Sequence, residues 1–243
     1  MQEVHTPEAV RERLGSPPRQ SHLRDFIYGG IDGTVTTFAV VAGVAGAGLS
    51  ATIVMILGVA NLVADGFSMA VSNLLATRAE IQEKALARRE EEREIRSIPE
   101  GEREEIRQIF ARKGFSGVEL DRVVDVITSD SAVWIDTMMT EELGYGRSHE
   151  RPFHAATATF AAFVLVGLIP LLAFLVELAW PGLLDSPFLW SSIMTGVAFF
   201  VVGAFKSRFV VQRWWLAGAE TLVVGSIAAT IAYVLGAVLK GLA

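Results

Sequence analysis

The chain has 243 residues, of which 51% are hydrophobic, and its mean hydropathy of +0.42 is too high for a soluble domain of this length. It contains no cysteine, which excludes disulfides, thiolate metal sites and haem attachment. The net charge of −6 arises mostly between residues 78 and 151, which hold 13 of the 21 Lys and Arg and 18 of the 27 Asp and Glu, so we expect no nucleic-acid partner.

The N-terminal residues 1–24 are polar and lack an apolar core followed by a small-residue cleavage site, so we expect a cytoplasmic segment without a secretory signal. Apolar residues then dominate two blocks that flank the charged region. The simplest interpretation is two membrane-embedded blocks, 25–79 and 152–243, on either side of a cytoplasmic helical domain at 80–151.

Five apolar stretches have the length of about 20 residues that a membrane-spanning helix needs. They cover residues 26–48, 52–77, 154–179, 187–205 and 215–239. Pro170 predicts a kink in the third stretch. Basic residues flank the spans in three places, which the positive-inside rule assigns to the cytoplasm, so the C-terminus is expected outside. They are Arg11, Arg13, Arg19 and Arg24; Arg78, Lys84, Arg147 and Arg151; and Lys206, Arg208 and Arg213.

The central domain shows helical patterns and no strand signal of any weight. The second span continues as a helix without a breaker, Pro99 begins the next helix, and residues 116–144 predict a third. The predicted fold class is therefore an all-α integral membrane protein with five transmembrane helices and a cytoplasmic three-helix domain between the second and third.

Asp32 lies inside the first span, in "YGGIDGTVTTF", and no Lys or Arg occurs between Arg24 and Arg78. Charged residues inside spans are costly and usually face a bundle interior or a water-filled cavity. The alternative is a structural role for Asp32, as a cap or interhelical partner in a bend made by neighbouring glycines. We favour a functional role.

Asn61, Asp65 and Met69 follow at i, i+4 and i+8 in the second span, which places them on one helix stripe. Counted from the cytoplasmic ends, Met69 and Asp32 lie at similar depth, and Asp65 and Asn61 lie deeper. This stripe resembles a stepwise path for a divalent cation. A structural role is an equal alternative for Asp65 and the commoner one for an isolated Asn61. Glu220, in the fifth span, is a further candidate, with pairing to Arg213 as its alternative.

The central domain offers carboxylate pairs at i, i+3 and a segment with two methionines, "DTMMTEELG". Such oxygen and thioether ligands would suit Fe(II) or Mn(II). From spacing alone, a solvated helix face is the favoured alternative. The candidates are Glu91, Glu94, Glu102, Glu105, Met138, Met139, Glu141 and Glu142.

Signatures of other activities are missing from the sequence. There is no Glu-x-x-His pair of the ferritin type and no phosphate-binding Gly-x-x-x-x-Gly-Lys loop. We therefore expect neither an enzyme nor an ATP-driven pump, and transport would draw on an ion or proton gradient.

Four segments, "YGGIDGTVTTFAVVAG", "ADGFSMAVSNLLATRAE", "IPEGEREEI" and "DTMMTEELG", resemble the vacuolar iron transporter family, including its bacterial members. The resemblance covers residues 21–240. It implies a dimer with five transmembrane helices and a cytoplasmic three-helix metal-binding domain, which exports Fe(II), and in some members Mn(II), in exchange for protons. It also implies that Asp32 and Met69 line the pore, and that the metal-binding residues are Glu91, Glu94, Glu102, Glu105, Met138, Met139 and Glu142.

The sequence departs from the plant-type pattern at Asn61, where those members have a glutamate. Two alternatives follow. Either Asp65, one turn further on, has taken over the role of this carboxylate, or the proton coupling or ion preference of this chain differs from that of the plant-type members.

The leading hypothesis is thus a homodimeric, proton-coupled exporter of divalent iron, with manganese as a second cargo, in a bacterial inner membrane. It requires no cofactor. Its rival is a membrane-anchored metal sensor or storage protein, and a weaker rival is a membrane scaffold. The intramembrane stripe distinguishes the transporter, because an anchor does not need it.

Overall fold

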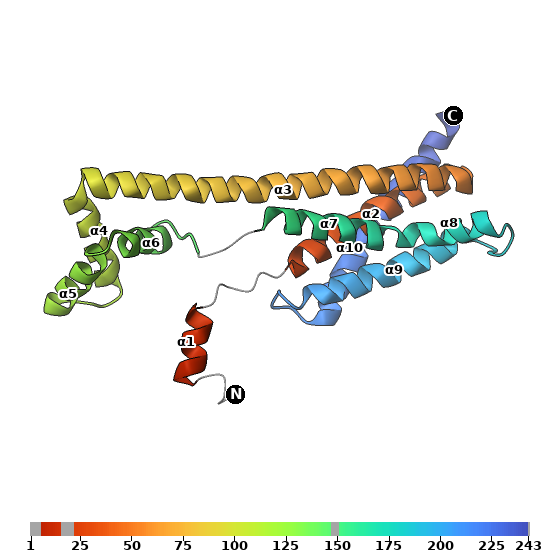
Figure 1. Cartoon of the computed structure of the whole chain (residues 1–243). Coiled ribbons are helices and arrows are strands. Elements are labelled where there is room, and N and C mark those ends of the chain that lie inside the picture. Colours follow the sequence, from red (N-terminus) through yellow and green to blue (C-terminus); the bar gives the residue numbers. More distant parts are fainter. Residues whose placement is uncertain (1–5, 16–21, 147–150, 243) are drawn as a thin grey trace. The chain divides into compact units, whose positions relative to one another are not determined.

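The computed structural model describes residues 6–15, 22–146 and 151–242, and the regular structure within these ranges is helical throughout. Arg19 and Arg147, two of the residues used for the predicted orientation, lie outside them. The chain separates into two compact units, which we describe individually (Figure 1). The polar unit comprises Met1–Gln20 and Ala76–Glu150, and the membrane unit comprises Ser21–Leu75 and Arg151–Ala243.

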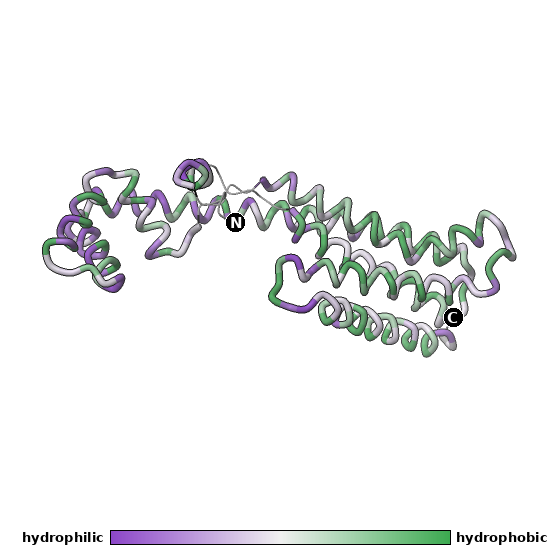
Figure 2. The backbone as a smooth tube through the Cα atoms, turned by 90° about the horizontal axis from the view of Figure 1, so that it is seen from below, coloured by the Kyte–Doolittle hydropathy of each residue, from purple (hydrophilic) through white to green (hydrophobic). Residues whose placement is uncertain are grey.

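The membrane unit consists of apolar helices, which Figure 2 shows as predominantly hydrophobic along their length. Four helices are each long and apolar enough to span a bilayer, and two shorter ones, bent by 48° at their junction, together make a fifth candidate span. The prediction of an all-α integral membrane protein is therefore confirmed. The four are α2 (Leu23–Gly46), α3 (Ala51–Ser97), α9 (Pro187–Lys206) and α10 (Trp214–Leu239), and the bent pair is α7 (Pro152–Gly167) and α8 (Ile169–Ala179). A 3-10 turn, η2 (Lys240–Leu242), follows α10.

The bend in the third span lies where Pro170 predicts it. The proline has no N–H, and its ring would clash with the carbonyl of Val166 in a continuous helix, so α7 ends at Gly167 and α8 begins at Ile169. The carbonyl of Pro170 accepts a hydrogen bond of 2.6 Å from the Ser191 hydroxyl of α9. The kink thereby becomes a polar connection between two spans.

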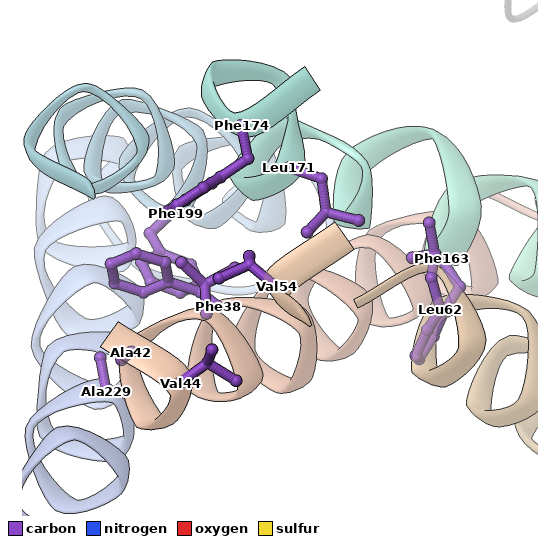
Figure 3. Close-up of a cluster of buried hydrophobic side chains, with 11 residues drawn as sticks. Phe38, Ala42, Val44, Val54, Leu62, Phe163, Leu171, Phe174, Phe199 and Ala229 are labelled. Carbon is purple, nitrogen blue, oxygen red and sulfur yellow. The ribbon is translucent and has the colours of Figure 1, made fainter. Parts of the chain in front are cut away.

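Helices α2 and α7 pack with their backbones in direct contact. A Cβ atom at Gly33 would lie 2.5 Å from the carbonyl oxygen of Phe163, and one at Gly29 would lie 2.6 Å from that of Thr159. Only glycine permits this approach. Large side chains fill the space that remains between the helices, among them Phe38, Phe163 and Phe199 (Figure 3).

The polar unit is built from short helices around its own hydrophobic core. Ile106, Val124 and Met138 are fully buried there. Across its surface, Arg107 pairs with Asp121 at 2.6 Å and so connects two of the helices. The core lies between the polar end of α3, α4 (Pro99–Arg112), α5 (Gly117–Thr128) and α6 (Ser131–Glu141). The same unit includes α1 (Pro7–Gly15), none of whose described residues belongs to this core.

The division of residues 116–144 differs from the prediction of one helix. The structure has two helices, α5 and α6, separated at Ser129 and Asp130. Asp130 has an extended backbone, and its carboxylate accepts hydrogen bonds from the N–H groups of Ala132, at 2.8 Å, and Val133, at 3.4 Å. It therefore caps a new helix instead of continuing the preceding one. The predicted start at Pro99 is confirmed.

Candidate functional site

The polar stripe on α3 contains a directly bonded pair. The side-chain amide of Asn61 donates a hydrogen bond to the carboxylate of Asp65, one turn further along the helix. Both side chains are half-buried. The carbonyl oxygen of the Asn61 amide is buried and accepts no hydrogen bond from any described residue, so it is a free oxygen ligand beside a carboxylate.

Asp32 brings a second carboxylate to this place from α2. Its side chain is exposed on the surface of the single chain, within electrostatic reach of Asp65. Helix α2 is unbroken through Asp32, whose backbone carbonyl accepts a 2.9 Å hydrogen bond from the Thr36 hydroxyl, so Asp32 is not a helix cap. Two like charges in apolar surroundings repel each other unless a cation or a proton lies between them.

Met69 follows Asp65 by one further turn and is half-buried, with its side chain against the apolar core of the membrane unit. The structure thus places Asp32 within electrostatic reach of Asp65. Met69 lies on the same stripe as that pair because the helix α3 is continuous.

Asn73 extends the stripe by one more turn, and the sequence interpretation missed it. Its amide donates two hydrogen bonds to other helices, at 3.2 Å to the carboxylate of Asp25 in α2 and at 2.8 Å to the hydroxyl of Thr159 in α7. The signal that points to Asn73 is its spacing, because it continues the series Asn61, Asp65, Met69 at four-residue intervals.

In the polar unit, two glutamates are almost completely buried. Glu91 is 4% exposed and Glu102 is 3% exposed, and one oxygen of each carboxylate has no hydrogen-bond partner among the described residues. Burial, followed by repulsion from neighbouring glutamates, raises the pKa of both to about 7. Both groups therefore change protonation state near neutral pH.

The other predicted carboxylates surround this pair. The charges of Glu94, Glu105 and Glu142 act on both Glu91 and Glu102, and burial, followed by repulsion from Glu105 and Glu94, raises the pKa of Glu142 as well. Within the described ranges, no three Asp, Glu or His side chains converge closely enough to hold a metal ion. These glutamates thus concentrate negative charge in one part of the polar unit.

The remaining candidates have different surroundings. Met138 is fully buried in the core of the polar unit, and Met139 packs against that core. Glu141 forms an ion pair of 2.5 Å with Lys113. In the membrane unit, Glu220 pairs at 3.1 Å with Lys206 of α9, and not with the Arg213 that the sequence suggested.

Comparison with known proteins identifies relatives over most of the chain. The family model described as the VIT family matches residues 23–237. The chain is 33% identical to a "Vacuolar iron transporter" of Toxoplasma gondii, with 98% of this chain and 82% of that protein covered. It is 32% identical to "Vacuolar iron transporter 1" of Arabidopsis thaliana, with 90% and 86% covered, and 30% identical to "Vacuolar iron transporter 1" of Eucalyptus grandis, with 92% and 91% covered.

Proposed function

The chain belongs to the VIT family, and from this premise we propose that it exports divalent iron from the cytoplasm in exchange for protons, with manganese as a second cargo. Relatives over most of its length carry the name of iron transporters. The observation that carries the proposal is that Asp32 of α2 lies within electrostatic reach of Asp65, which is bonded to Asn61, inside apolar helices. A membrane anchor has no use for two carboxylates at that place.

The chemistry of these side chains supports antiport. Two carboxylates and an amide oxygen are hard ligands, which suit Fe(II) and Mn(II). The same two carboxylates can hold protons, but a bound cation and a bound proton compete for one charge. Each metal ion released to one side therefore favours proton uptake at the same atoms.

The exposure of the site supports a homodimer. In the single chain Asp32 is exposed, and the apolar part of α3 is mostly unburied. A charge open to hydrocarbon costs several kcal/mol or more. We propose that a second copy covers this face, so that each chain supplies half of an enclosed path.

The glutamate cluster of the polar unit supplies metal to this path in our proposal. Its negative charge raises the local concentration of cations, and Met139, which packs against the core of the same unit, adds a thioether. Met138 would have to leave the core to join. From this capture site, ions pass to Met69 and then to Asp32. The capture residues are Glu91, Glu94, Glu102, Glu105, Glu142, Met138 and Met139.

The basic residues that flank the spans support an orientation with the N-terminus and residues 80–151 in the cytoplasm and the C-terminus outside. We propose a bacterial inner membrane as the location. The protein acts as a transporter and not as an enzyme, with the metal as its substrate and no cofactor.

A flux assay in proteoliposomes tests the proposal. Under a pH gradient, the wild-type chain should move Fe(II), and Asp32→Ala should abolish this movement while the dimer stays folded. Glu220→Gln, which changes a carboxylate already paired with Lys206, is the matched control and should retain flux. Full flux in Asp32→Ala would refute the pathway.

The rival function, a metal sensor or storage protein, has its own test. Replacing Glu102 and Glu105 by Ala should lower metal affinity under either function. Only a transporter also loses flux. Metal binding by a wild-type chain that moves no ion in any gradient would favour the sensor.

A further inference from the structure

We propose that Asn73 is a positioning residue for transport, which locks α3 to α2 and α7 and thereby sets Asp65 opposite Asp32. The inference rests on the proposed function. We call the three side chains Asn73, Asp25 and Thr159 the clasp. Asn73 lies within the segment "ADGFSMAVSNLLATRAE" but has no role in the expected pathway. Its amide nitrogen bonds to two other helices, which points to a positioning role.

The clasp joins three helices at one point. From α3, Asn73 donates to the Asp25 carboxylate of α2 at 3.2 Å and to the Thr159 hydroxyl of α7 at 2.8 Å. Thr159 is 1% exposed, and its own hydroxyl donates to the carbonyl of Ala155 at 3.0 Å. The hydrogen bonds of the clasp therefore form a chain that ends on the backbone of α7.

Asp25 is held from its other side as well. The imidazole Nδ1 of His22 lies 3.4 Å from the second carboxylate oxygen of Asp25, and the His22 ring stacks on His154 with 6.0 Å between centroids. Arg24, the neighbouring cation on α2, lies over the ring of Tyr28. Asp25 of α2 is thus held by His22, which in turn contacts His154 of α7, and α3 adds the amide of Asn73 as a further partner.

Elsewhere, α3 meets α7 through apolar contacts at the level of the pathway. A Cβ atom at Gly66 would lie 3.0 Å from the ring of Phe163, and a Cβ at Gly167 would lie 2.6 Å from Leu62. Such apolar contacts resist separation of the helices, but they contain no directed bond that would define the rotation and register of α3. Two hydrogen bonds with defined directions fix both.

The position of the clasp connects it to the transported ion. Asn73 lies eight residues beyond Asp65 on the same helix, which is about 12 Å along a rigid α-helix. A rotation of α3 at Asn73 therefore turns Asp65 and Asn61 away from Asp32 by the same angle. Breaking the clasp should lower the maximal rate of transport, whereas metal capture by the glutamates of the polar unit should be unchanged.

The test exchanges the amide of Asn73 and the carboxylate of Asp25 within the clasp. Asn73→Ala removes the donor, and Asn73→Asp faces the Asp25 carboxylate with a second carboxylate; each should lower maximal flux about tenfold or more, as expected for the loss of a hydrogen bond to a charged group. The double variant Asp25→Asn with Asn73→Asp restores an amide–carboxylate pair with donor and acceptor exchanged. The Thr159 hydroxyl can turn to donate to the new carboxylate. Flux should recover to within about twofold of the wild type.

A second readout measures α3 directly and does not depend on transport. Because the chain has no cysteine, spin labels can be placed at Leu75 of α3 and Leu165 of α7, both exposed, without background. The distance distribution should broaden in Asn73→Ala and Asn73→Asp and narrow again in the exchanged pair. Ser72→Ala, at the exposed neighbouring residue, is the control and should change neither readout.

The outcomes separate this inference from the proposed function. Wild-type flux in Asn73→Ala, or an exchanged pair no better than Asn73→Asp, would overturn the clasp while transport stands. If the wild-type chain moves no metal, the proposed function fails, and the distances between the spin labels alone decide whether the clasp holds α3. An unchanged distribution in Asn73→Ala then overturns the clasp, and a broadened one that the exchange reverses supports it.

Discussion

The amide of Asn61 is hydrogen-bonded to the carboxylate of Asp65 on the next turn of α3. This bond links Asn61, where the resemblance to plant-type members leads us to expect a glutamate, with the aspartate one turn later. The amide holds the aspartate in place through its N–H and leaves its own oxygen free. The pair can therefore act as one unit, with Asp65 supplying the charge.

The first prediction separates these two contributions. Asp65→Asn removes the charge and should abolish Fe(II) flux. Asn61→Ala removes only a hydrogen bond to that charge, which is worth about 1.5–3 kcal/mol, and should weaken apparent metal affinity by about tenfold or more. Flux measured against metal concentration in proteoliposomes checks both. A greater loss in Asn61→Ala than in Asp65→Asn would make the amide the principal ligand.

The second prediction concerns the contact between α2 and α7 beside Asp32. Gly33→Ala places a methyl group 2.5 Å from the backbone oxygen of Phe163, which cannot move without shifting α7. Overpacking of this kind costs about 1–3 kcal/mol. Gly196→Ala is the matched control, because its new methyl would meet only Leu222 at 3.7 Å, an ordinary contact. Thermal unfolding in detergent should show a lowered Tm for Gly33→Ala alone.

The third prediction concerns the unexpected break in the polar unit. Asp130→Ala removes the side chain that caps α6 and should destabilise the polar unit by about 1 kcal/mol. Ser116, at the start of α5, makes no capping hydrogen bond, so Ser116→Ala is the control. Hydrogen exchange of the first α6 amides is the measurement. Equal exchange rates in both variants would show that the cap does not define this helix.

The break shows what the sequence could and could not predict about the fold. Apolar length and the distribution of charge identify the spans because the bilayer imposes both, and Pro170 identifies the kink because it lacks an N–H. Residues 116–144 have apolar side chains at helical spacing on both sides of Asp130, so spacing alone indicates one helix. The capping bonds of Asp130 decide otherwise, and they become visible only in three dimensions.

The candidate site, too, could be predicted only in part from the sequence. Intramembrane carboxylates such as Asp32 and Asp65 could be identified from the sequence, because a charge in an apolar stretch is costly. The sequence could not show which glutamates are buried. Glu102 and Glu105 are three residues apart on one helix, yet only Glu102 faces the core. Spacing also could not show that Glu141 has a cation partner, Lys113, on another part of the polar unit.

The fourth prediction concerns metal binding by the buried glutamates. The pKa values of Glu91 and Glu102 are raised from the ordinary 4.5 to about 7, so at pH 6 both are largely protonated and at pH 8 both are charged. A divalent cation must displace these protons. Apparent Mn(II) affinity of the full chain in detergent should therefore rise steeply from pH 6 to pH 8, by up to about tenfold per unit and per proton displaced. Calorimetry in buffers of different ionisation enthalpy should detect proton release at pH 6 and little at pH 8.

The same shifts determine how stability depends on pH. Because both pKa values are raised, the folded polar unit binds more protons than the unfolded chain between about pH 4.5 and pH 7. The contribution of these groups to stability is fully present below pH 4.5 and is lost as the pH rises through about 7. Glu102→Gln removes the buried charge and should slow hydrogen exchange of α4 at pH 8 while it weakens Mn(II) binding. Glu119→Gln, at an exposed position, should change neither. Faster exchange in Glu102→Gln at pH 8 would contradict the assignment of Glu102 as a buried, destabilising charge that metal neutralises.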